Sequence, residues 1–294
     1  MIFISSFLHA AGALTGLAIG DALGAPLEGL PPPMRKVTDM EQSPKSKWKK
    51  GIFTDDTAQA LAVAESLAVC RGYSPYDLIT RLISGYQKHP ELYGPTSSRV
   101  FELVITGKSP QDAARTVHLL AGSSRSNGSV MRGPPIGIFY SGPMVEACSE
   151  VCSSLTHYDP VCGACSAFLN RMISDLCRGI SKERAYGRAL ARCSNDEVAS
   201  RIGEYRRYEP LSDLDALLAT HAAIRVFMEE EGFEAVVTRA VNLGGDSDTV
   251  GALAGSLAGA AFGIGGIPPR WLTELDALPL VIFTAYRLWF VSKE

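Results

Sequence analysis

Two short acidic segments contain the residues of this sequence that are best suited to chemistry. Residues 54–57 read TDDT and residues 246–249 read DSDT, and each segment opens an apolar helical pattern. One Asp or Thr is enough to cap a helix N-terminus, and a carboxylate there also gains from the helix dipole. Capping is therefore the simpler explanation of either segment alone, but both segments have more side-chain oxygens than a cap requires.

Together, the two segments favour a binding site for a divalent cation. Clustered aspartates repel one another and resist burial unless a positive charge neutralises them. Oxygen ligands from Asp and Thr suit hard ions such as Mg²⁺ or Mn²⁺, and neither segment contains the His or Cys that zinc sites use. Two such ions close together could clamp vicinal hydroxyls and activate a water molecule.

Regularly spaced glycines predict how the acidic segments are brought together. They recur every fourth residue in two stretches, at Gly12, Gly16, Gly20 and Gly24 and at Gly251, Gly255, Gly259 and Gly263. Residues four apart share a helix face, so each helix has a face without side chains, although glycine costs roughly 1 kcal/mol per helical position. We expect two central helices in close contact. If they are antiparallel, Glu28 lies beside Asp246 and Asp248.

The remaining patterns predict a single all-α domain over residues 1–294. Helical periodicity dominates and sustained strand-like alternation is missing. One helix is expected over residues 55–72, and capping residues predict further starts at Ser74, Ser109, Asp159, Ser181 and Ser212. A polar loop is expected between Pro31 and Gly51.

Composition limits the environment and the partners. The net charge is −3, so the chain has no basic field and nucleic acid is not expected as a main partner. Seven cysteines, an odd number, indicate a reducing compartment and a cytoplasmic location. The apolar N-terminus has no Lys or Arg before Arg35, and residues 249–269 are uncharged but rich in Gly and Ala. We therefore expect buried helices rather than membrane insertion, and a monomer.

Two further features have weaker chemical meaning. Cys162 and Cys165 have the spacing of a redox pair or half a zinc site, but no second pair follows, which favours small buried residues on a helix. The Gly/Ser/Asn-rich loop around residues 123–129 could bind phosphate through backbone N–H groups or be an ordinary surface turn. His157, just before Asp159, is by itself more typical of a structural hydrogen-bonding residue.

Five segments occur in the order found in one protein family. They are GLAIGDALGAPLEG, FTDDTAQAL, NGSVMRGPPIGIF, LTHYDP and NLGGDSDTVGALAGSLAGAAFGIGGIP, and they extend from about Gly12 to Pro268. In this the chain resembles the ADP-ribosylglycohydrolases. The resemblance implies an orthogonal helical bundle with a centre of two Mg²⁺ or Mn²⁺ ions and, as substrate, an ADP-ribosylated protein or an ADP-ribose-containing small molecule.

The same resemblance implies roles for individual residues. The implied metal ligands are Thr54, Asp55, Asp56, Asp246, Asp248 and Thr249. The implied substrate-binding residues are Glu28, Ser124, Ser126, Asn127, Gly128, Ser129, Met131, His157 and Gly245, with Arg132 in the segment matching the one that holds the diphosphate. Glu28, Asp55 and Asp248 are the candidates for moving the proton during hydrolysis at C1″ of the ribose.

Two other functions are compatible with the acidic residues. A metal-free glycosidase could use two carboxylates such as Glu28 and Asp55, and a non-catalytic ADP-ribose binder or structural relative could retain the fold.

Relatives that cleave ADP-ribosyl-arginine tend to have an Asp-x-Gly element before a Thr-rich helix. Here the comparable residues are Tyr93, Gly94 and Pro95, which leaves arginine-, serine- or otherwise linked ADP-ribose open.

Overall fold

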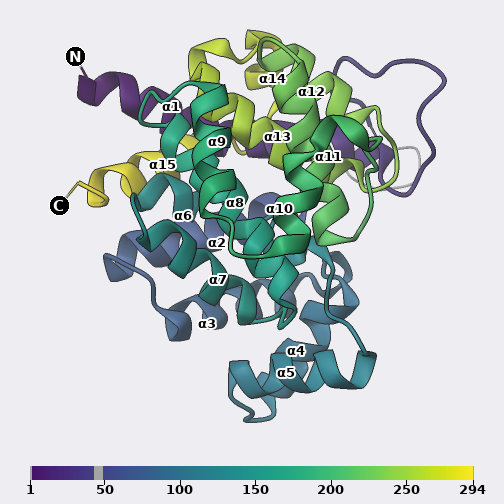
Figure 1. Ribbon diagram of the computed structural model, residues 1–294, viewed down its shortest axis with the longest axis vertical. Coiled ribbons are helices and arrows are strands. Elements are labelled where there is room, and N and C mark those ends of the chain that lie inside the picture. Colours follow the sequence, from purple (N-terminus) through teal and green to yellow (C-terminus); the bar gives the residue numbers. More distant parts are fainter. Residues whose placement is uncertain (1, 43–48, 294) are drawn as a thin grey trace.

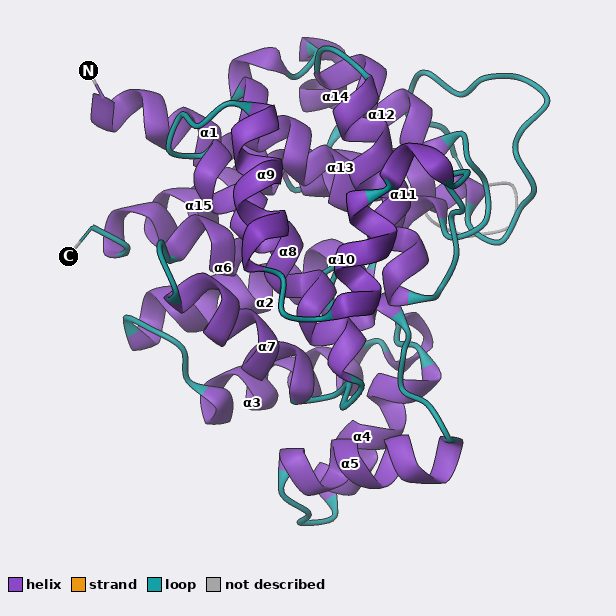
Figure 2. Cartoon of the chain, in the orientation of Figure 1, coloured by secondary structure: helices purple, strands orange, loops and turns teal. Residues whose placement is uncertain are grey.

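The computed structural model describes residues 2–42 and 49–293, and the fold is all-α (Figure 2). Within the described part no strand forms, and only two isolated β-bridges occur. The first half contains α1 (Ile2–Gly24), α2 (Asp55–Cys70), α3 (Pro75–Lys88), α4 (Pro95–Ile105), α5 (Pro110–Ala121), α6 (Pro134–Phe139) and α7 (Met144–Ser154). The second contains α8 (Pro160–Leu176), α9 (Lys182–Arg192), α10 (Asp196–Gly203), α11 (Ala216–Glu229), α12 (Phe233–Val241), α13 (Ser247–Phe262), α14 (Pro269–Glu274) and α15 (Leu278–Val291).

Helices α1 and α13 pack antiparallel at the centre, as the glycine spacing predicts. A Cβ atom built on Gly12 would lie 2.4 Å from the carbonyl oxygen of Gly259, and one on Gly16 would lie 2.2 Å from that of Gly255. One on Gly20 would lie 2.0 Å from Gly251 O. Any other residue at these positions would force the helices apart. The eighth glycine, Gly263, differs, because it follows the helix with a φ of +69° and ends it.

The hydrophobicity of α1 is explained by its position in the core. Residues 6–27 are long and apolar enough to cross a membrane, but 89% of the apolar window is buried inside the protein. Helix α13, whose sequence also suggested a span, is buried from Ser247 to Ala260. In Figure 1 both helices pass through the middle of the molecule, covered by their neighbours. No membrane insertion is evident.

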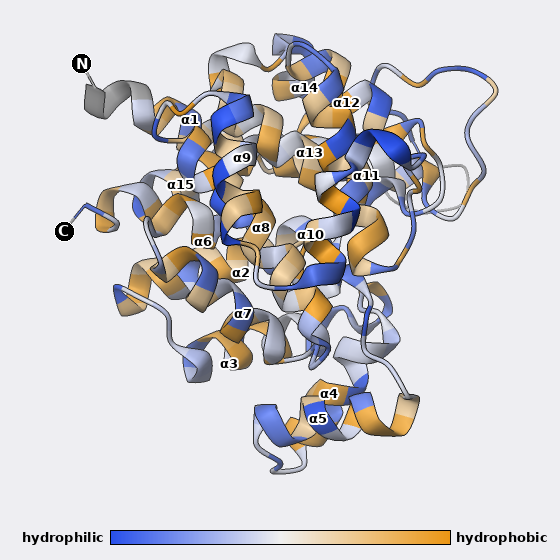
Figure 3. Cartoon of the chain, in the orientation of Figure 1, coloured by the Kyte–Doolittle hydropathy of each residue, from blue (hydrophilic) through white to orange (hydrophobic). Residues whose placement is uncertain are grey.

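Helix α8 forms a second buried axis. All its residues from Val161 to Leu176 are buried, and it packs against α6, α7, α9 and α11. Figure 3 shows hydrophilic residues along the outer helices α9 and α10 and mostly apolar or neutral ones on α8. Cys162 and Cys165 are free and buried on this helix, which confirms that they act as small core residues.

Helices α4 and α5 form a lobe at one end of the molecule (Figure 1). Their contact has its own small apolar cluster of Val100, Ala113, Ala114 and Val117, separate from the main core. Pro95, the first residue of α4, directly follows Tyr93 and Gly94. The segment that departs from the family pattern therefore leads into this lobe.

Most of the expected helix starts are confirmed. Ser74, Ser109 and Asp159 each accept a backbone hydrogen bond as N-caps, and α9 begins directly after Ser181. The start at Ser212 is wrong, because α11 begins at Ala216 with Asp215 as its cap. Backbone pairing explains the difference: the N–H of Asn127 donates to Leu214 O at 2.9 Å, which keeps the preceding residues extended. The loop expected between Pro31 and Gly51 has no helix where it is described, and residues 43–48 lie outside the described residues.

The central contact predicts a steep cost for a single methyl group. Gly16→Ala places a Cβ against the backbone of Gly255, and we expect the unfolding free energy to fall by about 1–3 kcal/mol. Gly187→Ala is the matched control, since Gly187 lies in α9 with open space around its Cβ position. That change should be neutral or stabilise by up to about 1 kcal/mol. Urea unfolding measures both, and equal stabilities for the two variants would contradict the close contact.

Candidate active site

The antiparallel helices bring three carboxylates together. Glu28, Asp246 and Asp248 each offer an oxygen, and these oxygens all lie within 4.8 Å of one another. Glu28 follows the end of α1, whereas the two aspartates lie at the beginning of α13, whose backbone at Asp248 contacts Gly24. The expectation that Glu28 lies beside both aspartates is confirmed. The aspartates are buried and Glu28 is exposed, so the cluster opens to solvent on the Glu28 side.

The TDDT segment at the beginning of α2 belongs to the same cluster electrostatically. Burial, followed by repulsion from Asp248 and the other aspartates, raises the pKa of Asp56 well above its ordinary value. Burial, with repulsion from Asp21 and Glu28, raises the pKa of Asp55 to about 8. Burial and the charge of Asp246 likewise raise the pKa of Asp248. Without a cation, these groups therefore tend to hold protons near neutral pH.

The N-cap residues of the two acidic segments do not cap their own helices, although Asp248 Oδ1 accepts from the N–H of Thr249 at 3.0 Å. Thr54 and Asp246 occupy the N-cap positions of α2 and α13, and neither side chain accepts a capping hydrogen bond. The Oδ1 atom of Asp56 is buried without any hydrogen-bond partner. These carboxylates are therefore not explained by helix capping, which was the simpler interpretation of the sequence.

Asp21 supplies the cap of α2 from another helix, and the sequence reasoning missed it. Its carboxylate accepts hydrogen bonds from the N–H and hydroxyl of Thr54, at 2.9 and 2.8 Å, and from those of Thr57, at 3.0 and 2.6 Å. Burial raises the pKa of Asp21 to about 6, although these hydrogen bonds favour the carboxylate. The available signal was a single carboxylate inside the otherwise uncharged α1, directly after Gly20.

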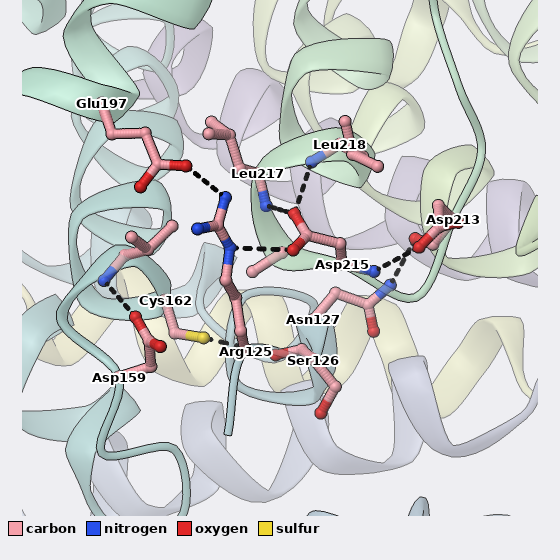
Figure 4. A network of polar contacts seen from close by, with 12 residues as sticks. Arg125, Ser126, Asn127, Asp159, Cys162, Glu197, Asp213, Asp215, Leu217 and Leu218 are labelled. Atoms are coloured by element: carbon pink, nitrogen blue, oxygen red, sulfur yellow. Dashed lines mark hydrogen bonds and ion pairs between the residues drawn. The ribbon is translucent and has the colours of Figure 1, made fainter. Parts of the chain in front are cut away.

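Asn127 connects the polar loop to the acidic cluster. Its side-chain amide donates to a carboxylate oxygen of Asp246 and, at 3.3 Å, to the backbone oxygen of Asp213. Figure 4 shows the surrounding network, in which Arg125 pairs with Glu197 at 2.7 Å and with Asp215 at 2.8 Å. The loop is thus anchored to α10 and to the beginning of α11, and Asn127 is held beside the cluster.

Several of the residues with implied ligand or substrate roles have buried side chains. Ser124 accepts from the N–H of Asp159 at 3.1 Å, and Ser129 pairs with Ser153 at 2.7 Å. Met131 is buried, with its sulfur 3.9 Å from the hydroxyl of Thr249. The hydroxyls of Ser124 and Ser129 therefore serve the packing of the loop, and Thr249 lies one residue beyond Asp248 at the cluster.

Ser126, Gly128 and His157 meet at the half-buried side of the loop. The Nε2 atom of His157 lies 2.9 Å from Ser126 Oγ. A Cβ on Gly128 would lie 3.3 Å from Cε1 of His157. Burial, followed by the nearby charge of Arg132, lowers the pKa of His157 to about 3. His157 is therefore neutral at physiological pH and acts as a hydrogen-bonding residue here.

Arg132, in the segment that the resemblance matches to the one holding the diphosphate, has a completely buried side chain. It donates to Gln59 Oε1 at 3.3 Å, and Gln59 Nε2 donates to Asp55 Oδ2 at 2.9 Å. Gln59, one helical turn after Asp55, was also missed in the sequence. An uncharged residue on an apolar helix gives no local sign of such a role.

Two glycines shape the backbone beside Glu28. The N–H of Gly29 donates to Gly245 O at 2.8 Å, and the N–H of Gly245 donates to Leu30 O at 2.7 Å. Gly245 has a φ of +62°, and a Cβ there would lie 2.1 Å from Ser212 O. Gly245 therefore joins the segment after α1 to the beginning of α13, which holds Glu28 over the aspartates.

Tyr93 brings the departing segment close to the cluster. Burial and the neighbouring charge of Asp55 raise the pKa of Tyr93 to about 12. Its ring packs edge-on against those of Tyr86 and Phe101. Of the three residues of the departing segment, Tyr93 thus places an uncharged phenol near Asp55.

Comparison with known proteins agrees with this arrangement. The profile of the ADP-ribosylglycohydrolase family matches residues 6–289. The chain is 30% identical to the ADP-ribosylarginine hydrolase Tri1 of Serratia proteamaculans (strain 568), over 97% of this chain and 80% of the relative. It is 29% identical to the ADP-ribosyl-[dinitrogen reductase] glycohydrolase of Rhodospirillum rubrum, over 91% of this chain and 90% of the relative.

A solved structure gives the same result for the fold. An ADP-ribosylglycohydrolase-related protein complex contains a chain that superposes with a TM-score of 0.87 at 30% identity, covering 98% of this chain and 99% of that one. The all-α fold of this type is thereby confirmed. The family profile, the two relatives and the fold all lead to one conclusion: the chain belongs to the ADP-ribosylglycohydrolase family of hydrolases.

Proposed function

We propose that this protein cleaves the glycosidic bond at C1″ of ADP-ribose attached to a protein side chain or a small acceptor, and releases ADP-ribose with the help of divalent cations. The observation that carries the proposal is the meeting of Glu28, Asp246 and Asp248 within 4.8 Å, next to a polar loop that leads away from them. A binding protein without catalysis has no need for so many buried like charges, which cost free energy when unneutralised.

The residues present fit one or two Mg²⁺ or Mn²⁺ ions. The proposed ligands are Thr54, Asp55, Asp56, Asp246, Asp248 and Thr249, all of which offer oxygen atoms. The buried Oδ1 of Asp56, which has no hydrogen-bond partner, supports this assignment because such an atom is costly to leave unpaired. When bound, a divalent cation supplies positive charge that lowers the free energy of the carboxylates and of developing negative charge on oxygen.

The other residues position and exchange protons in this proposal. Water attacks C1″ while the bond from C1″ to the acceptor breaks; the water keeps one proton as the new C1″ hydroxyl, a carboxylate takes up the other, and a proton is delivered to the leaving group. Glu28 is the exposed carboxyl of the cluster, and burial of part of its surface raises its pKa. We assign Glu28 the role of proton shuttle: its side-chain oxygen takes up the proton from the water and delivers a proton to the leaving group. Ser126 and Gly128 lie where the more distant part of the substrate would contact the loop.

Direct assay of ADP-ribose release tests this function. Arg-linked and Ser-linked ADP-ribosyl peptides are offered with Mg²⁺, Mn²⁺ or EDTA, and free ADP-ribose is measured. We expect release with a divalent cation from at least one linkage, loss of release in EDTA, and a fall of at least about 100-fold in kcat/KM for Asp248→Asn. Asp276→Asn, an exposed position between α14 and α15, is the control. Full activity in EDTA would instead favour a metal-free two-carboxylate glycosidase, and binding without release a non-catalytic protein.

The raised pKa values predict an unusual dependence of stability on pH. The pKa of Asp55 is about 8 in the folded protein, so between pH 6.5 and 8 the folded state binds more protons than the unfolded state, and the unfolding free energy in EDTA falls as pH rises. Asp56 and Asp248 act in the same direction. His157 acts in the opposite direction, mainly between its folded pKa of about 3 and its ordinary pKa of 6.5, so it opposes the fall only near the lower end of this range.

Urea unfolding in EDTA at pH 6.5 and pH 8 measures this fall. We expect a smaller fall for Asp55→Asn and an unchanged one for Asp276→Asn. Added Mn²⁺ should raise the unfolding free energy more at pH 8 than at pH 6.5, since it binds the ionised carboxylates. A stability that rises with pH over this range in EDTA would contradict the electrostatic description of the cluster.

A further inference from the structure

Arg132 is a buried cation that reaches both halves of the site without contacting a carboxylate. It is fully buried, and none of the ion pairs formed among the described residues includes it. One nitrogen, Nη1, donates toward Gln59 Oε1 at 3.3 Å and Gly128 O at 3.4 Å. The other, Nη2, donates to Thr156 Oγ1 at 2.7 Å and Cys152 O at 3.2 Å. These contacts extend toward the acidic cluster and toward the polar loop.

The contacts of Arg132 Nη2 determine which atom donates in the hydrogen bond between Thr156 Oγ1 and His157 Nδ1. Arginine is only a donor, so Thr156 Oγ1 must accept from it. Thr156 lies in the turn directly after α7, and its hydroxyl shares the Nη2 donor with the carbonyl of Cys152, four residues earlier. Arg132 already donates to that carbonyl. The remaining partner of the buried Thr156 hydroxyl is His157 Nδ1, at 2.8 Å, so the hydroxyl proton lies between Thr156 and Nδ1.

The imidazole then has its proton on the other nitrogen. A neutral histidine has one donor and one acceptor nitrogen. With Nδ1 accepting from Thr156, Nε2–H donates to Ser126 Oγ at 2.9 Å. The proton of Ser126 then points toward Thr96 Oγ1, in a long hydrogen bond of 3.4 Å that a closer acceptor oxygen of a bound molecule can replace. Ser126 is half-buried, so its hydroxyl can donate to a bound molecule.

We propose that Arg132 and Thr156 are positioning residues that fix His157 in the Nε2–H tautomer and thereby make Ser126 a hydrogen-bond donor to an acceptor oxygen of the substrate. This rests on the proposed function only for the identity of the substrate. Through Gln59, the same guanidinium also directs an amide N–H toward Asp55. The guanidinium of Arg132 thus orients two hydrogen-bond donors, the amide of Gln59 toward Asp55 and, through Thr156 and His157, the hydroxyl of Ser126.

The tautomer can be read directly. Protein labelled with ¹⁵N-histidine is examined by long-range ¹H–¹⁵N correlation spectra, and the His157 signals are assigned by their loss in His157→Gln. We expect Nε2–H in the wild type and in Arg132→Lys, which keeps a donor. In Arg132→Met the Thr156 hydroxyl is free to turn to Cys152 O, and we expect Nδ1–H to appear. Nδ1–H in the wild type, or unchanged Nε2–H in Arg132→Met, overturns the proposal.

A second variant keeps the test decisive if Arg132→Met does not fold. Thr156→Val removes the donor to Nδ1, so the Nδ1 resonance should move to that of an unbonded nitrogen, whereas Thr156→Ser should resemble the wild type. For ADP-ribosyl substrates we expect KM to rise about 3- to 10-fold in Thr156→Val, the effect of one weakened hydrogen bond, with a smaller change in kcat.

Thr220→Val is the matched control for these measurements. Its hydroxyl is also buried, donates to Ala216 O of α11 at 2.6 Å and has the core residue Cys165 as its other polar neighbour, so KM and the His157 spectrum should not change. An unchanged Nδ1 resonance in Thr156→Val, or equal KM values for Thr156→Val and Thr220→Val, overturns the proposal. Absence of ADP-ribose release by the wild type would contradict the proposed function, while the histidine spectra would still decide the tautomer.

Discussion

The rest of the structure depends on a contact between two helices that have no side chains between them. Where α1 and α13 cross, the Cβ positions of Gly16 and Gly20 are occupied by carbonyl oxygens of the opposite helix. Such closeness costs helix propensity at each glycine, and the burial of residues 10–24 of α1 and 247–260 of α13 offsets it. The contact brings the end of one helix to the beginning of the other, and this places Glu28 beside Asp246 and Asp248.

A cluster of this kind has to be held together against its own repulsion. Uncharged hydrogen-bond donors hold the carboxylates in place. The N–H and hydroxyl groups of Thr54 and Thr57 donate to Asp21. The side-chain amide of Asn127 donates to Asp246, and that of Gln59 donates to Asp55. Amides and hydroxyls fix the direction of a carboxylate without cancelling its charge. A site that is to receive a cation is better served by them than by arginine or lysine.

The sequence predicted the parts of this arrangement that repeat or that follow local rules. The four-residue glycine spacing predicted the central pair, and Ser74, Ser109 and Asp159 marked helix starts through their capping chemistry. Asp21, Gln59 and the contacts of Arg132 were missed because their partners lie on other elements and a single polar residue in a helix has no periodicity. Ser212 failed as a start for the same reason, since pairing with the loop at Asn127 overrides its local capping preference.

The equal spacing of the glycines does not by itself determine the register of α1 against α13. Sliding α1 along α13 by four residues, about 6 Å, would again set glycine against glycine, so the smooth faces permit several registers. The choice is made at one end, where the pairing of Leu30 with Gly245 and the bond from Ser247 Oγ to Gly24 O, at 3.0 Å, exist in only one of them. The residues next to the acidic cluster thus select one register of α1 against α13, so the site determines how the helices that support it are aligned.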